Sequence, residues 1–226
     1  DGENPARWRG HLDKLLPPRS RMRRVRHHAA LPYDELPAFI VRLRQEDGVA
    51  ARALEFLILT AARTGEVIGA TPDEIQEGMW TVPAERMKAG KEHRVPLSTP
   101  AMATADKMAA LGKPYLFPSR KFDAPLSNMA MLQLLSRMGR SDLTAHGFRS
   151  TFKDWASETT DHAPEVVEMA LAHAIDDKVE AAYRRGDLLQ KRVALMDDWA
   201  SFCANQKAAA QASANEDAPE AVVTTS

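Results

Sequence analysis

The chain has 226 residues, 44% of them hydrophobic and 27% charged, which suits one generous globular domain and excludes a chain disordered throughout. No run of eighteen apolar residues occurs, so no transmembrane helix is expected, and no basic-then-apolar export signal opens the sequence. The single cysteine, Cys203, excludes an internal disulfide and a multi-cysteine metal site. We therefore expect a cytoplasmic protein that does not act at a membrane.

The formal net charge of −1 conceals an uneven distribution of charge along the chain. Residues 1–30 are strongly basic, whereas the stretch after Lys207 is acidic and rich in small residues. A basic arm is typical of a segment that binds a polyanion, since Lys and Arg displace counterions from phosphates. The alternative is that the arm is only a solubilising linker. The candidate contacts to such a polyanion in this arm are Arg21, Arg23, Arg24 and Arg26.

Apolar periodicity predicts a mostly helical unit between residues 31 and 206. Alternating apolar residues predict a hairpin of strands around 80–82 and 95–97 with a long basic tip, and a third short strand near 74–76. The expected fold class is mainly α with a small three-stranded antiparallel sheet (α+β). Besides a short helical turn after Gly65, the predicted helices cover residues 33–45, 49–62, 99–111, 127–138, 144–158, 164–172, 177–185 and 187–206.

The two ends of the chain are expected to lie outside this unit. Residues 5–16 have the pattern of a helix, which the pair Pro17-Pro18 ends before the basic linker begins. We therefore expect residues 1–30 to be the end of a preceding helical region and an interdomain linker. Residues 207–226 have little to bury and are expected to be a disordered tail.

One predicted helix brings several cationic side chains together. His146, Arg149 and Lys153 lie at positions i, i+3 and i+7, so they share a helix face. A guanidinium there presents a planar fork of donors that matches phosphate oxygens. The alternative is an ordinary solvated polar face. A second, apolar stripe would anchor this helix in the core through Phe148, Phe152 and Trp155.

Cationic candidates also occur earlier in the chain. Arg63 ends an apolar helix and is followed after a glycine by Glu66, so it is either a helix cap or a ligand for an anion. Lys88 lies at the tip of the predicted hairpin, where a lysine usually protects a sheet edge but can also donate a proton. Lys91 is the rival candidate for that proton donor.

The last candidates are found near the C-terminal end. His173 follows the helix that Pro164 begins, and ten residues later Tyr183 stands before Arg184. A tyrosine beside arginines at a helix end is usually a surface aromatic residue. A phenol becomes a nucleophile only when a base and nearby cations assist its deprotonation.

Taken together, these residues resemble the tyrosine recombinases, and the phage-type integrases in particular. The order is arginine, hairpin lysine, His-x-x-Arg, histidine and tyrosine, and the resemblance runs from about Asn4 to Cys203. Four segments carry it: residues 61–69 (AARTGEVIG), 83–90 (PAERMKAG), 146–152 (HGFRSTF), and 171–173 (LAH) with 181–186 (AAYRRG). The resemblance implies a recombinase catalytic domain that cuts and rejoins DNA for the integration or excision of a mobile element.

The resemblance also implies a role for each candidate residue. Tyr183 would attack the scissile phosphate and form a 3′-phosphotyrosyl link. Arg63 and Arg149 would stabilise the charge of the transition state in place of a metal, and no cofactor or ATP would be needed. The remaining roles would be proton donation by Lys88, acid–base transfer by His146, a hydrogen bond to phosphate from His173, support from Glu66, and DNA contacts by Lys91, Lys153 and Arg184.

Partners follow from the same resemblance. We expect double-stranded DNA, further recombinase subunits that form a tetramer on paired sites, and a DNA-bending accessory protein. Without DNA the chain is expected to be a monomer. The chain is expected to be a catalytic fragment that has only the last stretch of the N-terminal domain that completes the clamp around DNA in the family. DNA binding should therefore be weak and sensitive to salt.

Three alternatives remain open. A non-enzymatic DNA-binding accessory module would use the same basic surface, and a type IB topoisomerase would use the same chemistry to relax supercoils. A metal-dependent nuclease is the third. The seven histidines form no His-x-x-x-His pair, and no clustered set of acidic ligands is visible. We expect no metal site.

Overall fold

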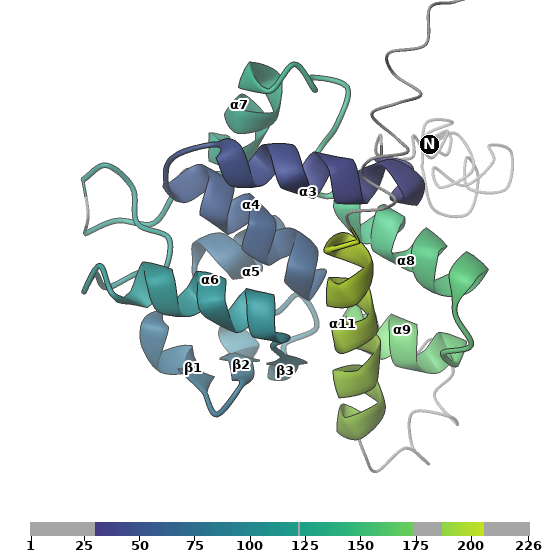
Figure 1. The fold of residues 1–226 in the computed structure, drawn as a ribbon. Helices are drawn as coiled ribbons and strands as arrows, with labels where there is room; N and C mark the ends of the chain where they lie inside the picture. The colour runs from purple at the N-terminus through teal and green to yellow at the C-terminus, as the bar shows by residue number, and fades with distance from the viewer. Residues whose placement is uncertain (1–29, 122, 174–186, 206–226) are drawn as a thin grey trace, which may run out of the picture.

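The computed structural model describes residues 30–121, 123–173 and 187–205. Figure 1 shows a body of helices with a small sheet at one edge. The predicted basic arm, the helix predicted over 177–185 and the predicted tail 207–226 lie outside the described residues. Within the described part of the chain, no helix is both long and apolar enough to cross a membrane.

Helix α4 (Val49–Thr60) forms the centre of the core. It packs against α3 (Leu36–Gln45), α6 (Thr99–Ala109), α7 (Ala130–Arg137) and the C-terminal helix α11 (Leu189–Cys203), as Figure 1 shows. Because neighbours surround it, α4 is apolar on nearly all sides. Its buried Glu55 is balanced by ion pairs with Arg44 and Arg52.

The sheet has three short antiparallel strands in the order β1 (Ile75–Gln76), β2 (Met79–Val82) and β3 (His93–Pro96). Trp80 pairs with Val95, and its ring lies 5.2 Å from that of Phe56 on α4, measured between centroids. Strand β3 also contacts α11. The sheet is therefore fixed between the central helix and the C-terminal helix.

The predicted fold class is confirmed, but several helix boundaries differ. Residues Tyr33–Glu35 form a 3₁₀ turn (η2) ahead of α3. Helix α4 ends at Thr60, because Ala61 adopts the left-handed conformation with φ of 49°. The chain then turns into the short helix α5 (Thr64–Ile68), with 3₁₀ turns at Pro72–Glu74 (η3) and Ala84–Arg86 (η4) on either side of the first two strands.

The remaining helices are α8 (Gly147–Thr159) and α9 (Pro164–Ala170), which lie beside α11 (Figure 1). An aromatic cluster joins α8 to α11. The indole of Trp199 is fully buried and lies tilted against that of Trp155, with 4.8 Å between ring centroids. It donates a hydrogen bond of 2.8 Å to the Ile58 carbonyl of α4. The C-terminal helix thus packs on its own domain, as its apolar face predicts.

A buried arginine fastens the start of α11 to the sheet. Arg192 is only 2% exposed and donates to the carbonyl of Arg94 on β3 at 2.6 Å. It also donates to the carbonyl and the carboxylate of Asp187, at 2.8 and 3.1 Å. Arg94 contacts the same carboxylate from the exposed side. Asp187 is thereby held between a strand and a helix.

We predict that Trp199→Ala lowers the free energy of unfolding by about 3–5 kcal/mol, because it removes a large buried ring and leaves a cavity. Urea denaturation followed by circular dichroism measures this change. The control is Lys191→Ala on the exposed face of the same helix, for which a change within about 0.5 kcal/mol is expected. A loss below about 1 kcal/mol in Trp199→Ala would contradict the packing described above.

Candidate active site

Two arginine side chains converge on one backbone carbonyl at the C-terminal end of α9. Arg149 Nη2 donates to the Leu171 oxygen at 2.6 Å, and Arg63 Nη2 approaches the same oxygen at 3.4 Å. Arg63 Nη2 also donates to the carbonyl of Ala172 at 3.1 Å. The sequence separates these two arginines widely, and the fold brings their guanidinium groups together.

The ends of two helices compensate the positive charge of this pair. Arg149 Nη1 donates to the carbonyl of Ala61, which caps α4, and Nη2 donates at the end of α9. Carbonyls at helix C-termini lack intrahelical partners and carry partial negative charge, so they suit a cation. Arg149 is only 5% exposed. Burial and the nearby positive charge of Arg63 lower the pKa of its guanidinium to about 10. Arg149 therefore remains charged at neutral pH.

Arg63 is held in place by Glu66. The carboxylate of Glu66 accepts from both the backbone nitrogen and Nη1 of Arg63, each at 2.8 Å, in a capping-box arrangement at the start of α5. Glu66 is itself only 4% exposed. Arg86, two residues before Lys88, donates to the Glu66 carbonyl at 3.1 Å and pairs with Glu74. The base of the hairpin tip is thus tied to α5.

His173 lies at the outer edge of the arginine pair. Its Nε2 is 3.2 Å from Arg149 Nη2, and its Nδ1 contacts the carboxylate of Glu168 on α9. Glu168 also pairs with Lys153 at 2.6 Å. Unlike Arg149, these three side chains are partly exposed, at 36–48% of their side-chain surface. The site therefore has the buried Arg149 and the partly buried Arg63 at its floor, and an accessible histidine at its rim.

The helix face predicted for α8 is only partly as expected. Helix α8 begins at Gly147, so His146 precedes it, and His146 is exposed whereas Arg149 turns into the interior. Lys153, a predicted DNA contact, is directed to Glu168. The exposed side chains of Lys88 and Lys91 lie on the loop before β3, and in the described residues no hydrogen bond or ion pair is recorded from either of them to the arginine pair.

Tyr183, Arg184 and the four arginines of the basic arm lie outside the described residues. Across residues 30–121, 123–173 and 187–205, no three His, Cys, Asp or Glu side chains form a group that could hold a metal ion.

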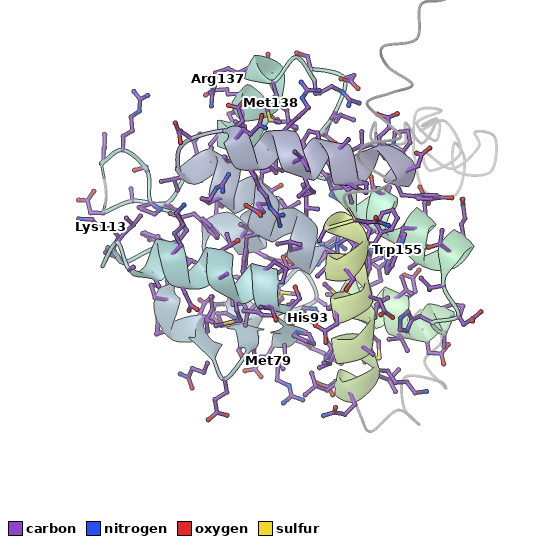
Figure 2. All side chains as sticks on the ribbon, in the orientation of Figure 1. Met79, His93, Lys113, Arg137, Met138 and Trp155 are labelled. Atoms are coloured by element: carbon purple, nitrogen blue, oxygen red, sulfur yellow. The ribbon has the colours of Figure 1, made fainter. Side chains whose placement is uncertain are left out.

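His93 was not among the site residues that the sequence predicted. His93 begins β3 and lies between the sheet and α11 (Figure 2). Burial lowers its pKa to about 4, helped by the charges of Arg192 and Arg63, although Glu66 and a hydrogen bond with the backbone of Ala170 oppose this shift. His93 thus stands behind Arg63 and Glu66 as a neutral ring. Its partners come from three separate helices, so its spacing in the sequence gives no signal.

The sequence profile of the phage integrase family matches residues 30–188. Prophage integrase IntZ of Escherichia coli (strain K12) is 36% identical over 184 residues, which cover 79% of this chain and 46% of IntZ. The integrase of enterobacteria phage P4 is 30% identical over 203 residues, with coverages of 79% and 46%. This chain spans about half the length of the curated relatives it matches.

Solved structures share the fold. A lambda integrase dimer bound to a COC′ core site superimposes with a TM-score of 0.53 at 20% identity, over 72% of this chain and 49% of that chain. The XerA recombinase gives a TM-score of 0.52 at 15% identity, over 93% and 70% of the two chains. The predicted recombinase catalytic fold is confirmed by these similarities.

The buried position of His93 generates a prediction about stability and pH. The folded-state pKa of about 4 lies below the ordinary value of 6.5, so between these values the unfolded chain binds a proton that the folded chain does not. The contribution of the neutral His93 ring to the free energy of unfolding is therefore complete above pH 6.5 and is lost as the pH falls toward 4. At a pH near 5 the loss should be about 1–2 kcal/mol.

We therefore expect His93→Gln to reduce the acid sensitivity of the free energy of unfolding by that amount. Urea denaturation of the wild-type chain and the variant at neutral pH and near pH 5 measures it, and the other titrating groups cancel in the comparison. Two pH curves that run parallel would show that His93 is accessible to protons in the folded state.

Proposed function

This chain belongs to the phage integrase family, and from that premise we propose that it cleaves and rejoins DNA strands as the catalytic part of a site-specific tyrosine recombinase. The observation that carries the proposal is the convergence of Arg63 and Arg149 on the Leu171 carbonyl. Three cations, Arg63, Arg149 and Lys153, outnumber the two carboxylates, Glu66 and Glu168. They leave a net positive charge beside an accessible histidine. Such a site favours a phosphodiester and the additional charge of its pentacoordinate transition state.

The proposed reaction exchanges one phosphate ester for another. The phenolic oxygen of Tyr183 forms a bond to phosphorus, and the bond from phosphorus to the 5′-oxygen breaks. The phenol proton passes to His146, and Lys88 donates a proton to the departing oxygen, which leaves as a 5′-hydroxyl. Because the tyrosyl ester retains the phosphodiester energy, a second 5′-hydroxyl reverses the step without ATP.

The positioning of each group follows from its charge and donors. Arg63 and Arg149 bind the non-bridging oxygens, since their planar forks match those oxygens in geometry. His173 donates to a phosphate oxygen from the rim of the site. Glu66 supports Arg63 from behind, consistent with its two hydrogen bonds of 2.8 Å.

The proposed partners are double-stranded DNA and further copies of the same protein. Lambda integrase has been solved as a dimer on a COC′ core site and as a tetramer on a Holliday junction. We propose a corresponding assembly on paired DNA sites for this protein, aided by a DNA-bending accessory protein. Contacts to DNA come from Lys91, Lys153, Arg184 and the arginines at 21, 23, 24 and 26.

We predict that Tyr183→Phe abolishes covalent protein–DNA adducts, because it removes the attacking oxygen and nothing else. Incubation with a pool of nicked suicide duplexes of randomised sequence, followed by denaturing electrophoresis, detects the adducts. Retention of DNA in a native gel should be equal for the two proteins. Adducts that persist in Tyr183→Phe, or a wild-type chain that forms none, would overturn the proposed reaction.

A second prediction concerns the arginine pair. Arg63→Lys keeps the charge and the partner Glu66 but loses the second nitrogen, so it cannot hold the phosphate with two parallel bonds. The rate of adduct formation should fall by about 100-fold. Quench-flow or timed gel assays measure the rate, and circular dichroism establishes that the variant folds. A folded variant with the wild-type rate would exclude Arg63 from the transition state.

A further inference from the structure

The contact between His173 and Glu168 has no role in the reaction described above. The Nδ1 atom of His173 lies 2.5 Å from Glu168 Oε2, and the other carboxylate oxygen lies 2.6 Å from the ammonium of Lys153. The opposite ring atom, Nε2, lies 3.2 Å from Arg149 Nη2. The four side chains therefore form one continuous chain of contacts from the surface to the buried arginine.

The backbone fixes this histidine–glutamate contact. The His173 N–H donates to the Glu168 carbonyl at 3.0 Å, and the Ala172 N–H donates to the Met169 carbonyl at 3.0 Å. Ala172 is left-handed, with φ of 49°. These two hydrogen bonds define a Schellman motif, which brings the third helical residue from the end into contact with the second residue after the cap. In α9 these two residues are Glu168 and His173.

The chemistry of the donors determines where the ring proton lies. An ionised carboxylate only accepts, so Nδ1 must carry the hydrogen that faces Glu168. A guanidinium only donates, so Nε2 must present a lone pair to Arg149. Both contacts are satisfied together by a neutral ring protonated at Nδ1, and by no other tautomer.

The charge state of Glu168 supports this arrangement. Its burial alone would raise the pKa of the carboxyl group, but the hydrogen bonds from Lys153 and His173 outweigh burial and lower it. Glu168 therefore stays ionised and can only accept. Because both members of the Lys153–Glu168 pair are more than a third exposed, the pair contributes little to stability. The pair instead holds the Glu168 carboxylate against the His173 ring.

We propose that Glu168, held by Lys153, is a positioning residue that fixes the Nδ1–H tautomer of His173 and directs Nε2 toward the phosphate site. This inference rests on the proposed function for its role in catalysis. With Nδ1 occupied, any further proton taken up by the ring is carried on Nε2, which then donates to a phosphate oxygen. Carboxylates that hold the second nitrogen of a functional histidine act in this way in other sites.

The tautomer can be measured without DNA. Two-dimensional nitrogen-15 NMR of the 226-residue chain at mildly alkaline pH distinguishes protonated from unprotonated ring nitrogens, and a His173→Gln spectrum assigns the signal. The wild-type ring should be protonated at Nδ1. Glu168→Ala should lose this preference, whereas Glu168→Gln should keep much of it because the amide oxygen still accepts from Nδ1. The matched control is Glu165→Gln, an acidic residue in the first turn of the same helix.

Adduct formation on the randomised suicide duplexes tests the consequence. Glu168→Ala should form adducts about 10–100-fold more slowly than wild type, with an unchanged thermal midpoint. Glu168→Gln should recover most of the rate, and Glu165→Gln all of it. A wild-type ring protonated at Nε2, or a Glu168→Ala variant with both tautomer and rate unchanged, would overturn the proposal. The expected NMR result with no adduct from the wild-type chain would instead overturn the proposed function alone.

Discussion

Two guanidinium groups of like charge share one carbonyl oxygen, and much of the surrounding architecture holds them there. Their mutual repulsion and the burial of Arg149 are unfavourable, as the lowered pKa of Arg149 indicates. The C-terminal ends of α4 and α9 offset this through the carbonyls of Ala61 and Leu171, and Glu66 supplies a full negative charge to Arg63. Since folding has already oriented the donors, binding of an anion needs little further rearrangement of the site.

The groups that balance the charged side chains of the site differ between its interior and its surface. At the floor of the site, backbone carbonyls and one carboxylate offset part of the charge of the arginines, and the carbonyls cannot move without disturbing a helix. At the rim, the partly exposed side chains of Glu168 and Lys153 hold the histidine. The loop between β2 and β3, which carries Lys88, is also attached to the site, because Arg86 in this loop donates to the backbone carbonyl of Glu66. The deepest arginine contacts are thus held by backbone groups, whereas partly exposed side chains hold the histidine.

Sequence periodicity predicted the helices and the small sheet because each element buries an apolar stripe. It did not predict the helix ends at Ala61 and Ala172. Both alanines adopt the left-handed conformation that glycine usually provides at a helix end, so the sequence contains no glycine to mark the boundary. The three-residue spacing of Arg63 and Glu66 was visible locally. The burial of Arg149 was not, because its partners are carbonyls 88 and 22 residues away. The contacts of His93 and Glu168 depend likewise on how separate elements pack, which composition and spacing do not encode.

The anchoring of Asp187 joins two elements through one carboxylate. Arg192 and Arg94 fix this residue to the sheet and to α11. Because Arg192 is only 2% exposed, removal of the carboxylate would leave its buried charge with backbone carbonyls alone. A buried cation that loses its anionic partner is strongly destabilising, so the attachment of the C-terminal helix to β3 depends on a single acidic side chain.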